Sequence, residues 1–177
     1  IDSRFLEPAC GTGNFLTEVL KRKLAAVKSR YRKSQLEYER NAVLAISSIY
    51  GIDILQDNVV KCRERLFSIF EKAYHRLFRT TSKNECCDAV KYILEKNIVH
   101  GDALTMKSVG DRPWPIVFAE WSFVNGSMLK RRDFVMSFLV DNHYQMRLFS
   151  DEGDPADINE PVREYPLIHF LKVGDAE

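Results

Sequence analysis

The chain has 177 residues, 45% of them hydrophobic and 29% charged, so we expect residues 1–177 to form a single compact domain. The 26 basic and 25 acidic side chains give a formal net charge of +1, and overall charge therefore provides no argument for nucleic-acid binding. No apolar run approaches the roughly 20 residues of a membrane-spanning helix, and the first residues lack the charged and apolar segments of a signal peptide. We expect a cytoplasmic protein with no membrane partner.

The four cysteines are Cys10, Cys62, Cys86 and Cys87. They contain no Cys-x-x-Cys pair, and the four histidines show no ligand spacing, so we expect neither a metal site nor a disulfide framework. The chain begins with Ile1 rather than Met and reaches a predicted strand within a few residues. We therefore expect a fragment that lacks upstream residues of a longer protein.

Short apolar runs alternate with helical periodicity along much of the chain. Strands are predicted over Arg4–Glu7, Ile49–Ile54, Asn97–Leu104 and Ile116–Phe123. Helices are predicted from Asn14 and over Gln35–Ser48, Asp57–Phe78 and Asp88–Lys96, with a polar loop at Thr80–Glu85. Because such alternation is typical of parallel sheets, the sequence predicts an α/β fold with a mainly parallel sheet and helices on both faces.

Residues 124–177 are assigned to the C-terminal part of the same domain. A turn there precedes the basic cluster Lys130, Arg131 and Arg132. This cluster suits contacts to DNA phosphates, and a solvated charged face is the alternative. Further on, the pattern predicts a helix with Phe134, Val135, Phe138 and Leu139 on its apolar face, an acidic loop over Ser150–Pro161 and a last strand over Tyr165–Val173.

Three of the predicted strands end in a carboxylate, namely Glu7, Asp53 and Asp102. Ligands of parallel α/β sheets bind at the carboxyl ends of the strands, so these acids are expected at one binding edge. The first acid precedes a turn with two glycines, in the stretch EPACGTGNFL. The turn lacks the third glycine of the dinucleotide fingerprint and the lysine of a Walker phosphate loop.

Three carboxylates beside a glycine turn suit a ligand with an ammonium group, ribose hydroxyls and an adenine amino group, and they would repel a polyphosphate. S-adenosylmethionine carries the first set of groups and no phosphate. On its own, a two-glycine turn is also compatible with a plain tight bend that binds nothing.

EPACGTGNFL resembles the cofactor-binding motif of the S-adenosylmethionine-dependent, adenine-specific DNA methyltransferases of restriction–modification systems. The usual form is Asp-Pro-Ala-Cys-Gly-Ser/Thr-Gly, a small or polar residue, and then Phe-Leu, so that Glu7 replaces the commoner Asp. YGIDI and NIVHGDAL resemble the second and third motifs of this family, in the same order. The resemblance covers roughly residues 4–123 and implies a Rossmann-like methyltransferase fold.

The resemblance also implies roles for individual residues. The methionine part of the cofactor would be surrounded by Glu7, Pro8, Ala9, Cys10, Gly11 and Gly13, above a helix that starts with Asn14, Phe15 and Leu16. Asp53 would accept hydrogen bonds from the ribose hydroxyls, with Ile54 against the adenine. Asp102 would accept from the adenine amino group, and Ala103 would donate through its backbone. The alternatives are that Cys10 is only a small residue that fits and that Asp102 is a turn-forming acid.

The family's catalytic motif, Asn/Asp/Ser-Pro-Pro-Tyr/Phe, is absent, because the chain contains no Pro-Pro. At the exit of the fourth predicted strand, Glu120 would accept a hydrogen bond from the target amine and Trp121 would stack on the flipped base. The alternatives are that Glu120 is an acid on a loop and that Trp121 is a core or lid aromatic. Three interpretations remain open. The two residues replace the motif, the motif lies in another part of a longer protein, or the domain binds the cofactor without methylating DNA.

The expected function is methyl transfer from S-adenosylmethionine to the exocyclic amine of adenine in DNA, with DNA and a specificity or restriction subunit as partners. A methyltransferase of a small molecule or protein is one alternative, and a non-catalytic subunit that binds the cofactor or DNA is another.

Overall fold

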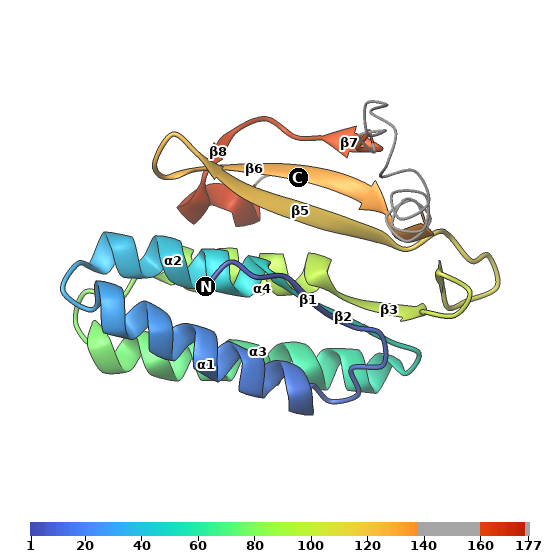
Figure 1. Cartoon of the computed structure of the whole chain (residues 1–177), viewed down its shortest axis with the longest axis horizontal. Helices are drawn as coiled ribbons and strands as arrows, with labels where there is room; N and C mark the ends of the chain where they lie inside the picture. The colour runs from blue at the N-terminus through green and yellow to red at the C-terminus, as the bar shows by residue number, and fades with distance from the viewer. Residues whose placement is uncertain (138–159, 176–177) are drawn as a thin grey trace, which may run out of the picture.

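The computed structural model of the chain describes residues 1–137 and 160–175 and has a mixed α/β fold (Figure 1). The first sheet contains β1 (Phe5–Glu7), β2 (Ile49–Asp53), β3 (Ile98–Asp102) and β4 (Lys107–Ser108), in that order across the sheet. The strands β1, β2 and β3 are parallel, whereas β4 runs antiparallel to β3. The three strands that end in acids are therefore parallel neighbours, as the sequence predicts.

Two helices follow β1 and two follow β2. They are α1 (Asn14–Tyr31), α2 (Gln35–Ser47), α3 (Gln56–Leu77) and α4 (Asn84–Asn97). The four helices predicted between Asn14 and Lys96 are confirmed, although α4 begins earlier and shortens the loop predicted at Thr80–Glu85. In Figure 1, α1 and α3 form one layer and α2 and α4 lie in the next. The apolar stripe of each helix is buried between these layers, where it forms the main core.

The two faces of the first sheet have different neighbours. On β2, Gly51 faces α1, and a Cβ added there would lie 3.0 Å from Cys10 Sγ. The side chains of Tyr50 and Ile52 point to the opposite face, because alternate residues of a strand do so. They pack in a second apolar cluster, which also contains Ile116, Phe118 and Met136. Of the described residues, those around β5 and the helical Met136 cover the second face. Residues 138–159 lie outside the described residues, so helices on both faces of this sheet stay a prediction.

The strand predicted to be the fourth of the parallel sheet belongs to another sheet. β5 (Val117–Val124) pairs antiparallel with β6 (Met128–Val135), so the prediction of a fourth parallel strand is wrong. Between them, Asn125 and Gly126 have φ angles of 52° and 78°, the left-handed conformation that tight hairpin turns use. The Asn-Gly dipeptide is therefore the sequence signal for this hairpin, and it outweighs the strand–helix alternation that precedes it.

The C-terminal elements also differ from the prediction. Phe134 and Val135 belong to β6 instead of the predicted helix. Met136 and Ser137 after them are helical, and Phe138 and Leu139 lie outside the described residues. So do residues 150–159 of the predicted acidic loop.

Two short strands, β7 (Arg163–Glu164) and β8 (Ile168–His169), pair with β6. The strand predicted over Tyr165–Val173 is wrong beyond β8, because a 3-10 helix, η1 (Phe170–Asp175), follows at once. The reason is that Phe170 and Val173, at helical spacing, are buried where η1 contacts α4. Among residues 1–137 and 160–175, no helix has the length and apolar character to cross a membrane.

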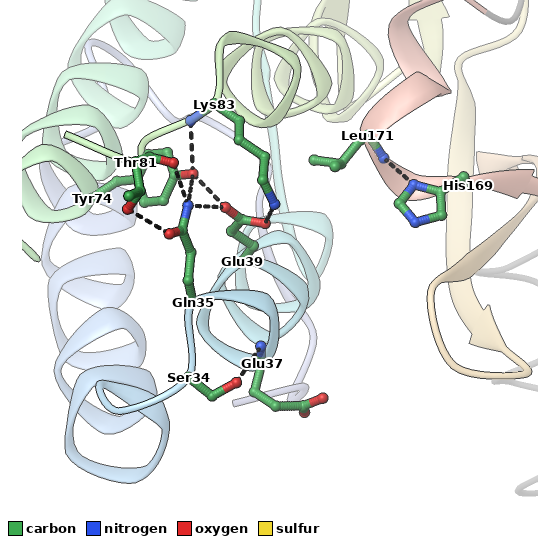
Figure 2. A network of polar contacts seen from close by, with 9 residues as sticks. All are labelled: Ser34, Gln35, Glu37, Glu39, Tyr74, Thr81, Lys83, His169 and Leu171. Carbon is green, nitrogen blue, oxygen red and sulfur yellow. Dashed lines mark hydrogen bonds and ion pairs between the residues drawn. The ribbon is translucent and has the colours of Figure 1, made fainter. Parts of the chain in front are cut away.

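A buried polar network joins α2, α3 and the segment before α4 (Figure 2). Glu39 is fully buried, and its carboxylate accepts hydrogen bonds from the Tyr74 hydroxyl, from Gln35 Nε2 at 2.7 Å and from Lys83 Nζ at 2.8 Å. The Tyr74 hydroxyl in turn accepts from the backbone N–H of Lys83 at 3.0 Å. Because a buried charge is costly without such partners, this network fixes how the two helix layers meet.

Candidate functional site

The glycine turn links β1 to α1 at the carboxyl end of the parallel strands. Gly11 and Gly13 have φ angles of +51° and +83°, in the left-handed region that favours glycine. Gly13 N donates a 2.8 Å hydrogen bond to Cys10 O, and Cys10 N donates one of 2.8 Å to Ile52 O. The first helix then begins at Asn14, with Gly13 as its N-cap. The predicted strand–turn–helix arrangement is therefore confirmed.

The two glycines are needed for different reasons. A Cβ at Gly13 would lie 2.6 Å from Cys62 Sγ of α3, whereas a Cβ at Gly11 would meet nothing within 4 Å. Real Cβ atoms do not approach other heavy atoms as closely as 2.6 Å. Gly13 is thus required both by the backbone conformation and by the close packing of the turn on α3, and Gly11 by its conformation alone.

Arg65 of α3 holds the turn from the side, and the sequence reasoning missed it. Its Nη1 donates hydrogen bonds to Thr12 O at 2.6 Å, to Thr12 Oγ1 at 2.9 Å and to Asn14 Oδ1 at 2.8 Å. These bonds connect residues more than fifty positions apart, and nothing in the local pattern around Arg65 distinguishes it from the other basic residues of α3. The turn is therefore fixed by α3 through both Cys62 and Arg65.

Asp53 lies at the end of β2 and binds the turn directly. Gly11 N donates to its Oδ2 at 2.8 Å, while Leu55 N and Asn58 Nδ2 donate to its Oδ1 at 2.9 and 3.0 Å. Burial disfavours the charged carboxylate, but the hydrogen bonds from Leu55, Asn58 and Gly11 outweigh it and hold the pKa of Asp53 below its usual value. Asp53 is therefore an ionised acceptor at the centre of this edge.

The other two acids lie at the ends of the flanking strands. Asp102 Oδ1 accepts from Leu104 N at 2.9 Å, and its Oδ2 accepts from Thr105 Oγ1 at 3.0 Å. Asp102 thus makes the hydrogen bonds expected of a turn-forming acid, and it remains half-buried at the strand end. Glu7 is also half-buried, and it pairs in register with Gly51 of β2.

Exposed apolar side chains follow the ends of these strands in the chain. Phe15 at the start of α1, Ile54 and Leu55 after β2 and Leu104 after β3 are all exposed, Leu104 by 93%. Apolar side chains next to a few fixed polar groups suit the ring of an organic ligand. The sequence reasoning included Phe15 and Ile54 but missed Leu55 and Leu104. The other predicted cofactor residues are exposed (Pro8, Ala9, Asn14), half-buried (Ala103) or buried in the core (Leu16).

The two catalytic candidates are engaged within the chain. Trp121 is only 5% exposed, and its indole N–H donates to Asn97 Oδ1 at 2.9 Å. Glu120 points to the other side of β5, where it forms ion pairs with Arg4 and, at 2.6 Å, with Arg132. Trp121 is thus a core residue, and the Glu120 carboxylate is neutralised by two guanidinium groups.

The basic cluster on β6 is likewise paired. Lys130 forms an ion pair with Glu164 at 2.9 Å. Two hydrogen bonds of 2.8 Å join the Arg131 guanidinium to Asp133. Burial lowers the pKa of Arg131, but these hydrogen bonds and the charge of Asp133 outweigh it and raise the pKa above its usual value. Arg132 pairs with Glu120 at 2.6 Å. The cluster therefore presents carboxylates as well as cations, and its contact with DNA stays a prediction.

The carboxyl edge of the parallel strands thus combines three carboxylates, a glycine turn held by α3 and exposed apolar side chains. Within the part of the chain that the structure describes, no group of three or more His, Cys, Asp or Glu side chains is arranged to hold a metal ion. In comparisons with known proteins, no protein-family model, no curated protein and no solved structure matches this chain.

Proposed function

We propose that this chain is the S-adenosylmethionine-binding, Rossmann-like core of an adenine-specific DNA methyltransferase of a restriction–modification system. The observation that carries the proposal is the 2.8 Å hydrogen bond from Gly11 N to Asp53 Oδ2, which joins the glycine turn to the acid that ends β2. The parallel order β1-β2-β3 supports it, because the strand ends with Glu7 and Asp102 then lie at the same edge.

Three groups of the cofactor have a proposed counterpart at this edge, namely the ribose, the ammonium group and the adenine. Asp53 accepts three N–H groups of the chain, and because a carboxylate has about four acceptor sites, one is left for a ribose hydroxyl. Glu7 would attract the ammonium group of the methionine part. Asp102 and the Ala103 backbone would recognise the adenine edge, while the exposed side chain of Ile54 would cover the ring.

The same geometry argues against a nucleotide polyphosphate. Phosphate-binding glycine turns offer free backbone N–H groups to the anion. Here the N–H of Gly11 is used by the Asp53 carboxylate, and the N–H of Gly13 by Cys10 O. A polyphosphate would therefore find these two N–H donors already in use, and the three carboxylates at the edge would repel it.

The reaction itself is a direct displacement at the sulfonium methyl group by the adenine amine. It requires alignment of amine, methyl carbon and sulfur more than it requires a strong base. The protein's part in the proposed reaction is therefore to hold the sulfonium at the glycine turn and to admit the base beside it. DNA and a specificity or restriction subunit are the proposed partners.

A second candidate is a cofactor-binding subunit that does not itself hold the target base. The observation that favours it is the engagement of both catalytic candidates, since Trp121 is buried and Glu120 is paired with Arg4 and Arg132. In that case a partner chain would supply the groups that position the amine.

Isothermal titration calorimetry with S-adenosylhomocysteine tests the cofactor proposal. We expect a single site in the wild-type chain and an affinity at least about tenfold weaker in Asp53→Asn, since a charged hydrogen bond is worth roughly 1.5–3 kcal/mol. Asp88→Asn is the matched control, because Asp88 is an exposed aspartate of α4 that pairs only with Lys91 in the contacts described. No binding by folded wild-type chain, or equal affinities of Asp53→Asn and wild type, would contradict the proposal.

Transfer of a tritiated methyl group to unmethylated DNA separates the two candidates. Incorporation into adenine supports the methyltransferase, and its loss in Glu120→Gln would assign Glu120 to the reaction. Cofactor binding without incorporation supports the second candidate.

A further inference from the structure

Basic side chains gather where α1 and α3 end. Residues 28–40 and 71–85 carry nine Lys or Arg side chains and four Asp or Glu side chains, an excess of five positive charges, although the whole chain has a formal net charge of only +1. The rest of the chain is therefore acidic on balance. A basic surface on a nearly neutral protein attracts an anionic partner to that surface alone.

The ends of the two helices lie together in the fold. The helices α1 and α3 pack side by side in one layer, and their last turns lie at the same end of it (Figure 1). The segments that follow them are joined by two hydrogen bonds of 2.6 Å, from Gln35 Nε2 to Thr81 O and from Thr81 Oγ1 to Gln35 Oε1 (Figure 2). The seven exposed Lys and Arg of residues 28–33 and 72–79 thus belong to one surface, which we call the basic end.

The charges of the basic end are free of internal partners. Within residues 1–137 and 160–175, none of these seven side chains forms an ion pair. Glu37 pairs instead with Arg40 at 2.8 Å, and the buried Glu39 pairs with Lys83 at 2.8 Å. Each cation of residues 130–132, in contrast, has a carboxylate partner. The basic end therefore offers the positive charge that the predicted cluster on β6 does not.

Helix electrostatics account for only part of the basic end. Cations in the last turn of a helix are favoured by its dipole, which explains the basic residues of the last turns of α1 and α3. Arg32 and Lys33 come after α1, and Arg79 comes after α3, so the dipole does not require them. Because like charges repel, gathering them beside the others opposes folding unless an anion is bound there.

The composition of this surface favours a nucleic-acid backbone over other anionic partners. Among residues 28–40 and 71–85, all of which the structure describes, Leu36 is the only large apolar side chain that is exposed. The surface therefore lacks the apolar core of a protein–protein interface and the apolar face of a helix that inserts into a membrane. Four of its seven cations are arginines, whose guanidinium groups bind phosphate oxygens in pairs.

We propose that the basic end is a docking surface for the phosphate backbone of double-stranded DNA. The 18 residues of α1 separate it from the glycine turn, a distance of roughly 27 Å at about 1.5 Å per residue. The phosphates bound there belong to DNA away from the target base, and the surface supplies affinity that is independent of sequence. The choice of DNA as the polyanion rests on the proposed function, whereas the surface exists whether or not the chain binds a cofactor.

Fluorescence anisotropy with a labelled, unmethylated duplex tests the docking surface on the full chain without cofactor. In about 0.1 M salt, Arg32→Gln/Arg79→Gln should bind the duplex at least about tenfold more weakly than wild type, because two phosphate contacts are lost. The slope of log K against log salt concentration should become shallower by roughly 2.

Arg22→Gln/Lys91→Gln is the matched control. It removes the same charge from two exposed side chains that pair within the chain, with Glu18 and Asp88, and its affinity for the duplex should stay within about twofold of wild type. Equal weakening in the control would show that only net charge matters and would overturn the proposal. So would an unchanged affinity of Arg32→Gln/Arg79→Gln, or wild-type binding to phosphatidylserine vesicles but not to the duplex.

Titration with S-adenosylhomocysteine separates this inference from the proposed function. Arg32→Gln/Arg79→Gln should bind it as wild type does, which also shows that the variant is folded at the glycine turn. If the wild-type chain docks the duplex at the basic end but does not bind S-adenosylhomocysteine, the proposed function fails and the docking surface stands. If it binds S-adenosylhomocysteine and the variant keeps full affinity for the duplex, the docking surface fails and the proposed function stands.

Discussion

The backbone N–H of Gly11 and the carboxylate of Asp53, 42 residues apart in the chain, are joined by a hydrogen bond of 2.8 Å. This bond ties the turn after β1 to the end of β2, and it also orients the acid that is proposed to hold the ribose. Binding and folding therefore depend on the same carboxylate, so a variant of Asp53 should change both properties.

Asp53→Asn should lower stability in a pH-dependent way. The amide cannot accept from the Gly11 N–H while it also keeps the contacts of Leu55 and Asn58, so we expect a loss of about 1–3 kcal/mol in the free energy of unfolding at pH 7. The pKa of Asp53 is lowered in the folded chain. Its contribution is therefore fully present above the usual Asp range and is lost as the pH falls from about 4 through the folded pKa.

Urea unfolding of wild type and Asp53→Asn between pH 7 and pH 3 measures this effect. The difference between the two proteins should be constant above about pH 5 and should shrink below about pH 4. A difference that does not change with pH would show that the carboxylate charge is not involved. Asp88→Asn, on an exposed surface, should stay within about 0.5 kcal/mol of wild type.

The two glycines of the turn should respond differently to alanine. Gly11→Ala should cost about 1–2 kcal/mol, because only the left-handed conformation is strained. Gly13→Ala should cost a further 1–3 kcal/mol, roughly, because its Cβ would also collide with Cys62 Sγ at 2.6 Å. Equal losses in the free energy of unfolding, measured by chemical denaturation, would exclude the close packing of Gly13 on α3.

Glu39 and Lys83, in the network of Figure 2, should contribute to stability as a coupled pair. Lys83→Met leaves the fully buried Glu39 carboxylate without its cation. Breaking a fully buried ion pair typically lowers the free energy of unfolding by roughly 3–5 kcal/mol. Because Lys83 itself is 40% exposed, we expect Lys83→Met to lower it by about 3 kcal/mol or less.

The double variant Glu39→Gln/Lys83→Met should recover part of this loss, since the neutral amide still accepts from the Tyr74 hydroxyl. A double-mutant cycle by denaturant unfolding gives the coupling energy, which should exceed about 0.5 kcal/mol. Simple additivity of the two single losses would refute coupling through the ion pair.

Fluorescence should distinguish the two tryptophans of the chain. Trp114 is 69% exposed and Trp121 is 5% exposed, so Trp114→Phe leaves only the buried indole. We expect blue-shifted emission from this variant and acrylamide quenching several-fold weaker than in Trp121→Phe. Addition of unmethylated DNA should leave the Trp121 emission unchanged, and strong quenching by DNA would instead indicate a stacked base.

The sequence by itself determined the strands and helices of roughly the first hundred residues and the acids at the ends of β1, β2 and β3. These features follow from local physics, because apolar periodicity selects the element and positive φ angles at the turn select glycine. The strand–turn–helix around Gly11 and Gly13 could therefore be derived without the structure.

Only the tertiary structure decided the partner of β5, the contacts of Glu120 and Trp121, and the attachment of the turn through Arg65 and Cys62. β5 is almost continuously apolar, as a central parallel strand would be, because the first sheet and the helices bury opposite sides of it. Its pairing was set instead by the turn at Asn125 and by packing against residues far away in the chain. Contacts between residues far apart in the chain produce no local sequence pattern, so they can be identified only in the folded structure.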